Sequence, residues 1–203
     1  MGKKIDPFLS KRFSKVFEKK LWGDRETISG PGSRKDNPMV VRALEALDYV
    51  IQKYNIIKIS DIPCGDFNWF KAITDKHKHL EYVGYDIVKK LIIQNHMLHP
   101  NIRFEHFDIV SDVPEPSDLI FTKELLIHLT NKDIFSALRN MKESGSRYLM
   151  ASNSFGVENI DLSVNSLGYA RPVDLCRPPF NFSSVLWNNA FYALWDFSSI
   201  KIH

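Results

Sequence analysis

Residues 56–67 read IIKISDIPCGDF, a β-rich apolar run that ends in a glycine turn before a predicted helix. A strand, a tight turn and a helix start let a backbone approach a nucleotide-like ligand. The dinucleotide motif G-x-G-x-x-G is absent, because only Gly65 is present. A pyrophosphate needs two close backbone approaches, so the stretch favours a cofactor without phosphates, whose charged amino-acid end meets Asp61 or Asp66. Taken alone, an ordinary βα turn explains this short motif equally well.

Strands and helices alternate along the chain on both sides of this stretch. The patterns predict helices over 39–54, 67–79, 87–98 and 131–143, the last after an asparagine cap, and strands over 56–62, 82–85, 102–107, 118–122 and 147–152. This alternation predicts an α/β fold with parallel βαβ units in an open, doubly wound sheet. Ligands of such sheets bind beyond the carboxyl ends of the strands, so we expect functional residues just after the strands.

The two ends of the chain lie outside this alternation. Apolar residues at helical spacing over 9–21 predict an amphipathic helix packed on the domain with its lysines in water, and a transit peptide or an anchor to an anionic surface is the alternative. Residues 22–38 read WGDRETISGPGSRKDNP and predict a loop. Residues 168–182 are proline-rich and predict irregular structure, whereas the aromatic segment 185–202 predicts a short closing hairpin whose aromatic side chains belong to the core.

Length and composition set the class of protein. The 203 residues, 44% hydrophobic and 25% charged, predict a single domain over 1–203, in which 1–38 form the N-terminal helix and a glycine- and serine-rich segment. The formal net charge of +3 does not by itself argue for a nucleic-acid or membrane partner. The longest apolar runs fall short of the ~20 residues of a membrane span, and the N-terminus has no apolar secretory region. With only two cysteines, we expect a cytoplasmic protein; the oligomeric state is not readable from the sequence.

Aspartates follow three successive predicted strands. Asp86 lies 21 residues after Gly65, the separation at which an acidic side chain accepts hydrogen bonds from ribose hydroxyls. Asp108 follows the third strand, where a side-chain acceptor is placed for an adenine amino group. One aspartate at a strand end is common, but three in succession favour a bound adenosine over a bare scaffold.

Residues 122–129, TKELLIHL, follow the fourth predicted strand. If a helix begins here, Glu124 and His128 lie one turn apart on the face that looks toward the reactive end of the cofactor. His128 would then remove a proton from an acceptor hydroxyl while Glu124 orients it. The alternative is a histidine that caps or packs the helix. The other histidines show no metal-ligand spacing, so we expect no metal, and neither a G-x-S-x-G elbow nor a Walker loop is present.

Three strings carry a resemblance: DIPCGDFNW from residue 61, YVGYDIV from residue 82, and DLIFTKELLIHLTNKDIFSALRNMKESGSRYLMAS from residue 118. They resemble a group of small class I methyltransferases that use S-adenosylmethionine (SAM) and whose first motif reads D-x-P-C-G-D-x-N-W. The segments LWGDRETISGPGS over 21–33 and GYARPVDLCRPPFNF over 168–182 extend the resemblance to nearly the whole chain, from Trp22 to Trp195.

The resemblance implies a Rossmann-like fold with a mostly parallel seven-stranded sheet, helices on both faces, and SAM as the methyl donor. It places Asp61, Gly65 and Asp66 at the methionine end of the donor, Asp86 at the ribose and Asp108 near the adenine. We add Pro63, Cys64, Ile87 and Lys123 to the expected cofactor set. The resemblance also implies that the loop 22–33 closes over the site as a lid, and that Trp22 and Arg171 contact the acceptor.

Three departures from the group's pattern affect catalysis and the end of the sheet. Lys123 and Glu124 stand where the group has Arg-Asp, which keeps the charges but changes their reach. Asp174 stands where the group has asparagine. The connection between Phe180 and Trp195 is shorter than in the group, so we expect the last strands to be shortened.

The combined prediction is a SAM-dependent methyltransferase acting on a small-molecule or glycan acceptor, at a hydroxyl oxygen. His128 and Glu124 are the expected catalytic residues, and Lys123 and Arg171 would supply positive charge for an anionic or polyhydroxylated acceptor. An inactive SAM-binding or scaffold module is the main alternative. The missing glycines argue against a nicotinamide oxidoreductase, and a nucleic-acid methyltransferase would need a (D/N)-P-P-(Y/F) motif that does not follow the fourth strand.

Overall fold

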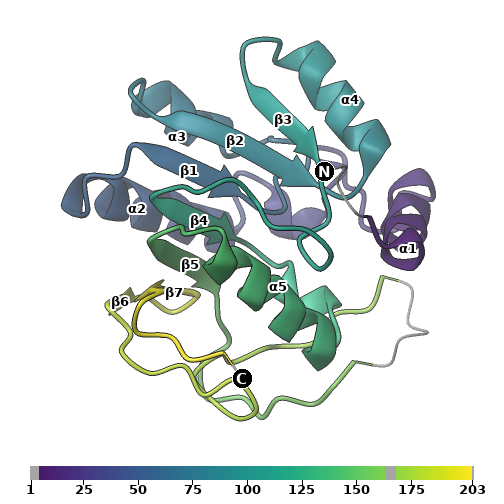
Figure 1. The fold of residues 1–203 in the computed structure, drawn as a ribbon. Coiled ribbons are helices and arrows are strands. Elements are labelled where there is room, and N and C mark those ends of the chain that lie inside the picture. The colour runs from purple at the N-terminus through teal and green to yellow at the C-terminus, as the bar shows by residue number, and fades with distance from the viewer. Residues whose placement is uncertain (1–4, 163–167, 203) are drawn as a thin grey trace.

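The computed structural model of the chain describes residues 5–162 and 168–202. Its centre is a seven-stranded sheet of order β3-β2-β1-β4-β5-β7-β6, in which β1 to β5 are parallel and β7 is antiparallel to both of its neighbours (Figure 1). The strands are β1 Lys58–Asp61, β2 Glu81–Asp86, β3 Arg103–His106, β4 Leu119–Thr122, β5 Tyr148–Ser152, β6 Trp187–Asn188 and β7 Tyr192–Asp196. The helices are α1 Pro7–Glu18, α2 Pro38–Lys53, α3 Lys71–Lys76, α4 Lys89–Leu98 and α5 Asn131–Glu143.

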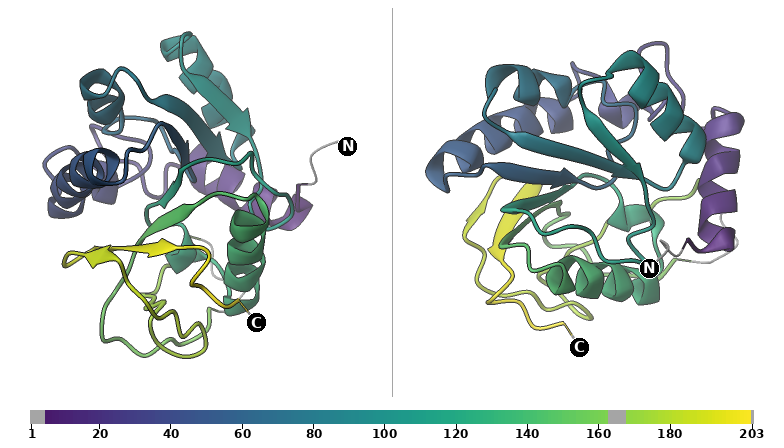
Figure 2. Two further views of the ribbon diagram at one scale, coloured as in Figure 1. Left: turned by 60° about the vertical axis from the view of Figure 1, so that its left-hand side comes forward. Right: turned by 45° about the horizontal axis from the view of Figure 1, so that its top comes forward.

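Separate apolar clusters bury the two faces of the sheet. One cluster joins the sheet to α2 and α3, and the other joins it to α5 and α1, so α2 and α5 lie on opposite sides (Figure 2). Successive residues of β4 divide between them: Leu119 and Phe121 pack toward α2, and Ile120 packs toward α5. Because side chains alternate along a strand, a strand covered on both faces reads as an uninterrupted apolar run.

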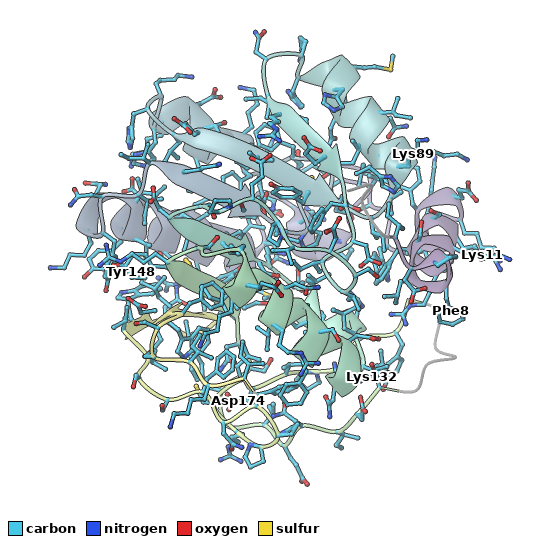
Figure 3. All side chains as sticks on the ribbon, in the orientation of Figure 1. Phe8, Lys11, Lys89, Lys132, Tyr148 and Asp174 are labelled. Carbon is cyan, nitrogen blue, oxygen red and sulfur yellow. The ribbon has the colours of Figure 1, made fainter. Side chains whose placement is uncertain are left out.

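The helix α1 lies beyond the carboxyl ends of the strands, and the arrowheads of β1 to β3 point toward it (Figure 1). The Asp6 carboxylate caps the helix by accepting hydrogen bonds from the first-turn backbone N–H groups. Its Leu9 and Val16 are buried, whereas Lys11 points outward (Figure 3). The prediction of a packed amphipathic helix is confirmed, although the helix ends at Glu18 and does not reach residue 21.

Most strand boundaries differ from the prediction by one or two residues, and two features of the helices differ in kind. The helix expected over 67–79 is shortened to Lys71–Lys76, because Phe67 has a φ of 56° and residues 68–70 form turns. The cap of α5 is Thr130, whose hydroxyl accepts a hydrogen bond from the N–H of Asp133, and not an asparagine.

The C-terminal segment closes the sheet as predicted. Strands β6 and β7 form an antiparallel hairpin, and β7 pairs with β5 along five residues. The expected shortening appears in β6, which has two residues. Of the tail aromatics, Tyr192, Trp195 and Phe197 are buried and Phe191 is partly buried, so they belong to the core. Across residues 5–162 and 168–202, the helices are too short or too polar to cross a bilayer.

Candidate functional site

A cavity of about 400 Å³ lies at the carboxyl ends of β1, β2 and β4. Its volume falls in the range of small-molecule and cofactor sites. It is walled by α1 and the loop 22–33 on one side, and by the turns after β1, β2 and β4 on the other. Most of the predicted site residues line it: Trp22, Asp61, Pro63, Cys64, Gly65, Asp66, Asp86, Ile87, Lys123, Glu124 and His128. Asp108 and Arg171 are not among its lining residues.

The turn after β1 depends on Gly65. Its φ is +54°, and a Cβ at this position would lie 2.5 Å from the Ser29 hydroxyl. The N–H of Gly65 donates to the Asp86 carboxylate at 3.2 Å, and its carbonyl accepts from the Asn95 side chain at 2.7 Å. These bonds join the ends of β1 and β2 to α4, so the turn is a rigid concave surface without side-chain bulk.

Two buried carboxylates face this turn. Asp86 accepts hydrogen bonds from the N–H groups of Gly65 and Val88, yet burial raises its pKa to about 6. Asp61 accepts from the Tyr82 hydroxyl at 2.8 Å, and burial raises its pKa well above the ordinary value. Buried carboxylates are costly unless further donors reach them, so the pair is suited to a ligand with N–H or O–H groups.

Asp66 holds the loop 22–33 against the turn. Its carboxylate accepts hydrogen bonds from the Thr27 hydroxyl at 2.7 Å, the Ile28 N–H at 2.9 Å and the Ser29 hydroxyl at 3.1 Å. A second tie joins the Asn68 side chain to Glu26 at 2.7 Å. Asp66 therefore lines the cavity while its oxygens are used by the loop, which forms a wall over the site.

The segment after β4 is not the predicted α-helix. Glu124 has a φ of +55°, which stops helical propagation, and residues Leu126–His128 form a single 3₁₀ turn. The Glu124 N–H donates to the Ser152 hydroxyl at 2.9 Å, and its carboxylate pairs with Lys123. Lys123 also donates to the carbonyl of Gly32 at 2.8 Å. In the described part of the chain, no hydrogen bond joins Glu124 to His128, so the expected helical pairing of the two is wrong.

His128 is held from three sides. Its ring stacks on Trp22 with centroids 4.4 Å apart and 25° between the planes. Its Nδ1 lies 2.8 Å from the carbonyl of Tyr169, and its own carbonyl accepts a hydrogen bond from Arg12 of α1. A carbonyl only accepts, so Nδ1 carries the proton and Nε2 carries the lone pair of the neutral ring. Burial lowers the pKa of His128, which favours this neutral form at neutral pH.

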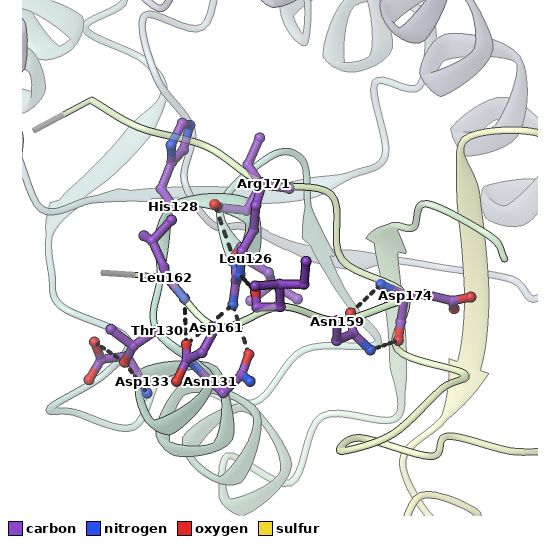
Figure 4. A network of polar contacts seen from close by, with 12 residues as sticks. Leu126, His128, Thr130, Asn131, Asp133, Asn159, Asp161, Leu162, Arg171 and Asp174 are labelled. Carbon is purple, nitrogen blue, oxygen red and sulfur yellow. Dashed lines mark hydrogen bonds and ion pairs between the residues drawn. The ribbon is translucent and has the colours of Figure 1, made fainter. Parts of the chain in front are cut away.

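Arg171 supports the His128 turn from outside the cavity (Figure 4). Its guanidinium donates to the carbonyls of Ile160 at 2.7 Å and Leu126 at 3.2 Å, and to the Asn131 side chain at 2.8 Å. The side chain is buried, and this burial lowers its pKa. Its donors are used within the protein, in contrast to the expectation that Arg171 reaches the acceptor.

Asp108 is occupied by the N-terminal segment. Its carboxylate accepts hydrogen bonds from the Asp6 N–H at 2.9 Å, the Val110 N–H at 3.0 Å and the Ser111 hydroxyl at 3.0 Å. It lines a separate space of about 30 Å³, which borders the main cavity at Pro63, Asp86 and Ile87. The predicted adenine acceptor thus lies next to the cavity but binds α1.

Three further residues shape the site and were not predicted from the sequence. Ser29, Tyr82 and Asn95 each bond a predicted residue of the β1 or β2 turn. Tyr82 and Asn95 occupy ordinary strand and helix positions, so no local pattern marked them. Ser29 lies within the quoted loop, but its partner Asp66 is known only from the fold. The described residues contain no cluster of three or more His, Cys, Asp or Glu placed to hold a metal.

No model of a protein family matches the chain, and no curated protein matches its sequence. Solved structures match its fold. The magnesium protoporphyrin IX methyltransferase of Synechocystis PCC 6803, solved with bound SAM, has a TM-score of 0.57 at 11% identity, over 96% of this chain and 97% of that chain.

Two further structures cover less of the chain. The plantazolicin methyltransferase, in complex with a triazolic desmethyl analogue and S-adenosylhomocysteine (SAH), has a TM-score of 0.52 at 16% identity, over 72% of this chain and 59% of that chain. The methyltransferase domain of bacterial CtHen1 has a TM-score of 0.50 at 16% identity, over 57% and 67%.

The chain spans about half to two thirds of the length of several of the methyltransferases that it matches. Their names indicate different acceptors: magnesium protoporphyrin IX for one enzyme and plantazolicin for another. At identities of 11% and 16%, these structural matches establish the fold and nothing finer. The sheet order and these matches together show that the chain has the Rossmann-like fold of class I SAM-dependent methyltransferases.

Proposed function

We propose that the chain is a SAM-dependent methyltransferase whose residues 1–203 form one domain. The observation that carries the proposal is the cavity at the ends of β1, β2 and β4, with the bare Gly65 turn and the buried Asp86 on its wall. Ligands of doubly wound sheets bind at this place. We also propose that the chain is related to the methyltransferases whose first motif reads D-x-P-C-G-D-x-N-W. The residues of this motif that line the cavity support the relation.

The lining residues fit an adenosyl ligand. Asp86 accepts hydrogen bonds from ribose hydroxyls, beside Ile87, which offers an apolar surface to the adenine. Asp61 meets the amino group of the methionine end. Lys123 supports Asp61 from a distance, because its positive charge lowers the pKa of Asp61 in part while its ammonium is held by Glu124 and by the carbonyl of Gly32. Pro63 and Cys64 shape the turn, and Asp66 keeps the lid loop over it.

SAM supplies a methyl group on a positively charged sulfur when it is bound. His128 is the base, because its neutral ring is fixed by Trp22 and Tyr169 with the lone pair on Nε2. Glu124 has no hydrogen bond to His128 in the described chain, so its proposed role is to orient the acceptor. The proposed role of Trp22 is to exclude water from the His128 ring. Asp108 and Arg171 act indirectly, since Asp108 anchors α1 and Arg171 anchors the His128 turn.

The acceptor is proposed to be a small molecule or a glycan, methylated at a hydroxyl oxygen. The acceptor of limited size is an analogy with the methyltransferases named for magnesium protoporphyrin IX and plantazolicin, which share the fold. A reducing compartment such as the cytoplasm is proposed because Cys64 and Cys176 are both free thiols.

The test is calorimetric titration of the purified protein with SAM and with SAH, with NADH as the control ligand. We expect dissociation constants of about 1–100 μM for the adenosyl ligands and no heat with NADH. The matched variants are Asp86→Asn, which removes the charge and leaves one acceptor oxygen for the ribose, and Asp112→Asn, which lies outside the cavity. Failure of the folded protein to bind SAM and SAH would refute the proposal.

The catalytic assignment is tested separately with His128→Gln. We expect SAH affinity to change little, while kcat falls about 100-fold because the base is removed. His79→Gln, an exposed histidine far from the cavity lining, is the matched control. Unchanged turnover in His128→Gln would exclude this role. Tight SAM binding without turnover on any acceptor would instead identify an inactive SAM-binding module.

A further inference from the structure

A second cavity adjoins the first on the side away from Asp86. Its volume is about 480 Å³, and it shares Glu124, Ile127 and Ala170 with the first cavity. The rest of its wall comes from the start of α2, the segment after β5, and the residues before β7: Met39, Ser152, Asn153, Ser154, Phe155, Val157, Arg171, Pro172, Ala190 and Phe191. None of these ten residues lines the first cavity.

Two positively charged side chains near this second cavity, Lys123 and Arg171, already have partners within the protein. Lys123 pairs with Glu124 and donates to the carbonyl of Gly32, and its side chain is 5% exposed. Arg171 lines the cavity, but its guanidinium donates to the backbone carbonyls of Ile160 and Leu126. An anion in this cavity would therefore be desolvated without a free cation among its described lining residues to meet it.

Glu124 is the acidic residue that lines both cavities. Its side chain is 29% exposed, and its backbone is fixed by the positive φ and by the hydrogen bond to Ser152. Lys123 engages Oε2, and no residue of the described chain donates a hydrogen bond to Oε1. The carboxylate therefore has an acceptor position left for a ligand at the boundary between the cavities.

The remaining wall is mostly apolar. Phe155 and Phe191 offer aromatic surface, and Met39 adds a flexible apolar side chain. The Asn153 amide is held within the protein, since it donates to Asp174 and accepts from the N–H of Leu175. Such a wall binds a body of aromatic or aliphatic character, and Glu124 supplies the polar contact.

We propose that the second cavity binds the methyl acceptor, and that it selects an acceptor with an apolar body and a neutral or cationic group that donates an N–H or O–H to Glu124. This inference rests on the proposed function. It replaces the expectation of an anionic acceptor held by Lys123 and Arg171, because both side chains are already bonded within the protein. Amines and alcohols are accepted, and carboxylates and phosphates are rejected.

The experiment measures binding of three probes with the same aromatic body: phenethylamine, 2-phenylethanol and 3-phenylpropionate. Each is titrated into the SAH-saturated protein and followed by ligand-observed NMR. We expect the amine and the alcohol to bind at about millimolar Kd, and the carboxylate to bind about 10-fold more weakly or not at all.

Two variants test separately the charge of Glu124 and the apolar wall of the second cavity. Glu124→Gln frees Lys123 of its partner, so the order reverses and 3-phenylpropionate binds best. Phe155→Ala weakens all three probes together and leaves SAH affinity unchanged, because Phe155 is exposed and lines only the second cavity. Its mutation leaves the core packing intact.

The outcomes distinguish this inference from the proposed function. SAH binding with equal affinity for the three probes, or with a preference for the carboxylate in the unmodified protein, overturns the inference alone. Absence of SAH binding overturns the proposed function, and the acceptor assignment with it. SAH binding with the expected order, reversed in Glu124→Gln, supports both.

Discussion

Asp86 is buried between two backbone donors, and this burial sets a pH dependence for ligand binding. An acid whose pKa is raised to about 6 is ionised above that pH and protonated below it. The ionised form accepts the most hydrogen bonds, so we expect affinity for SAH to be full at pH 7.5 and to fall as the pH drops through about 6. Calorimetry from pH 5 to pH 8 measures it. Asp86→Asn should bind weakly at every pH, and a flat profile in the unmodified protein would exclude Asp86 as the group responsible.

Gly65 and Gly145 form a matched pair with different surroundings. Both have positive φ, but a Cβ at Gly65 would meet the Ser29 hydroxyl at 2.5 Å, whereas a Cβ at Gly145 has nothing within 4 Å. Each alanine substitution costs about 1–2 kcal/mol of backbone strain. Only Gly65→Ala also displaces the loop 22–33, so we expect SAH affinity to fall about 10-fold or more in that variant alone. Urea denaturation and calorimetry measure both effects, and equal SAH affinity in the two variants would contradict the argument.

For single residues, the sequence predicted where a side chain lies better than it predicted what that side chain does. Gly65 and Asp86 lie at the cavity because the spacing of a βα turn is local and geometric. Asp108 also follows a strand, but a long-range bond from Asp6 occupies it. The pairing of Glu124 with His128 failed because a helical pattern of apolar residues does not reveal a positive φ. No local sequence pattern indicates what the charge of Arg171 contacts. In the folded chain its guanidinium donates to backbone carbonyls.

Among the elements, the loop 22–33 depends on Asp66. Three donors from the loop converge on this carboxylate, so Asp66→Asn removes charge-assisted bonds and leaves one oxygen to accept them. We expect faster proteolysis within 24–33 and SAH affinity about 10-fold weaker, with little loss of global stability. Limited proteolysis with and without SAH is the measurement. Asp36→Asn breaks an exposed ion pair in the same region and is the control, and equal cleavage of the two variants would count against a special role for Asp66.

The elements themselves were largely predictable, because the parallel strands read as short apolar runs and most helices carry apolar residues at helical spacing. The exception at 67–79 has a local cause, since Phe67 adopts a left-handed conformation and its ring packs against Tyr82 and Phe104. Tertiary packing there overrides the helical pattern. The cap of α5 was misplaced by one residue, a difference that side-chain hydrogen bonding decides.

For the whole molecule, the closing hairpin contributes directly to the stability of the sheet. Trp195 of β7 is fully buried, and it packs against Phe182 in the cluster that holds α5. Trp195→Ala should lower the free energy of unfolding by about 3–5 kcal/mol. Trp187→Ala, at a partly exposed position of β6, should cost clearly less. Urea denaturation compares the two, and equal losses would show that the hairpin stabilises the sheet uniformly.

The architecture followed from strand–helix alternation, which constrains a doubly wound sheet strongly. The position of α1 over the strand ends could not be predicted from the sequence. Amphipathic periodicity shows that a helix packs on the domain, but it does not show on which surface. Besides the burial of Leu9 and Val16, three long-range bonds hold it there: Asp6 to Asp108, Arg12 to His128, and Lys90 to Glu18. They join residues so distant in sequence that only the folded chain relates them.

The same long-range bonds bear on the order in which the protein is made. Trp22 donates to the carbonyl of Gly168, 146 residues later, and Arg12 reaches the carbonyl of His128, 116 residues later. Chains leave the ribosome from the N-terminus, and contacts across such separations close slowly. The first walls of the cavity to be synthesised therefore wait for their partners until residue 168 has emerged. A nascent chain that stops before Gly168 contains the parallel strands but no finished binding site, so ligand binding becomes possible only after Gly168 has left the ribosome.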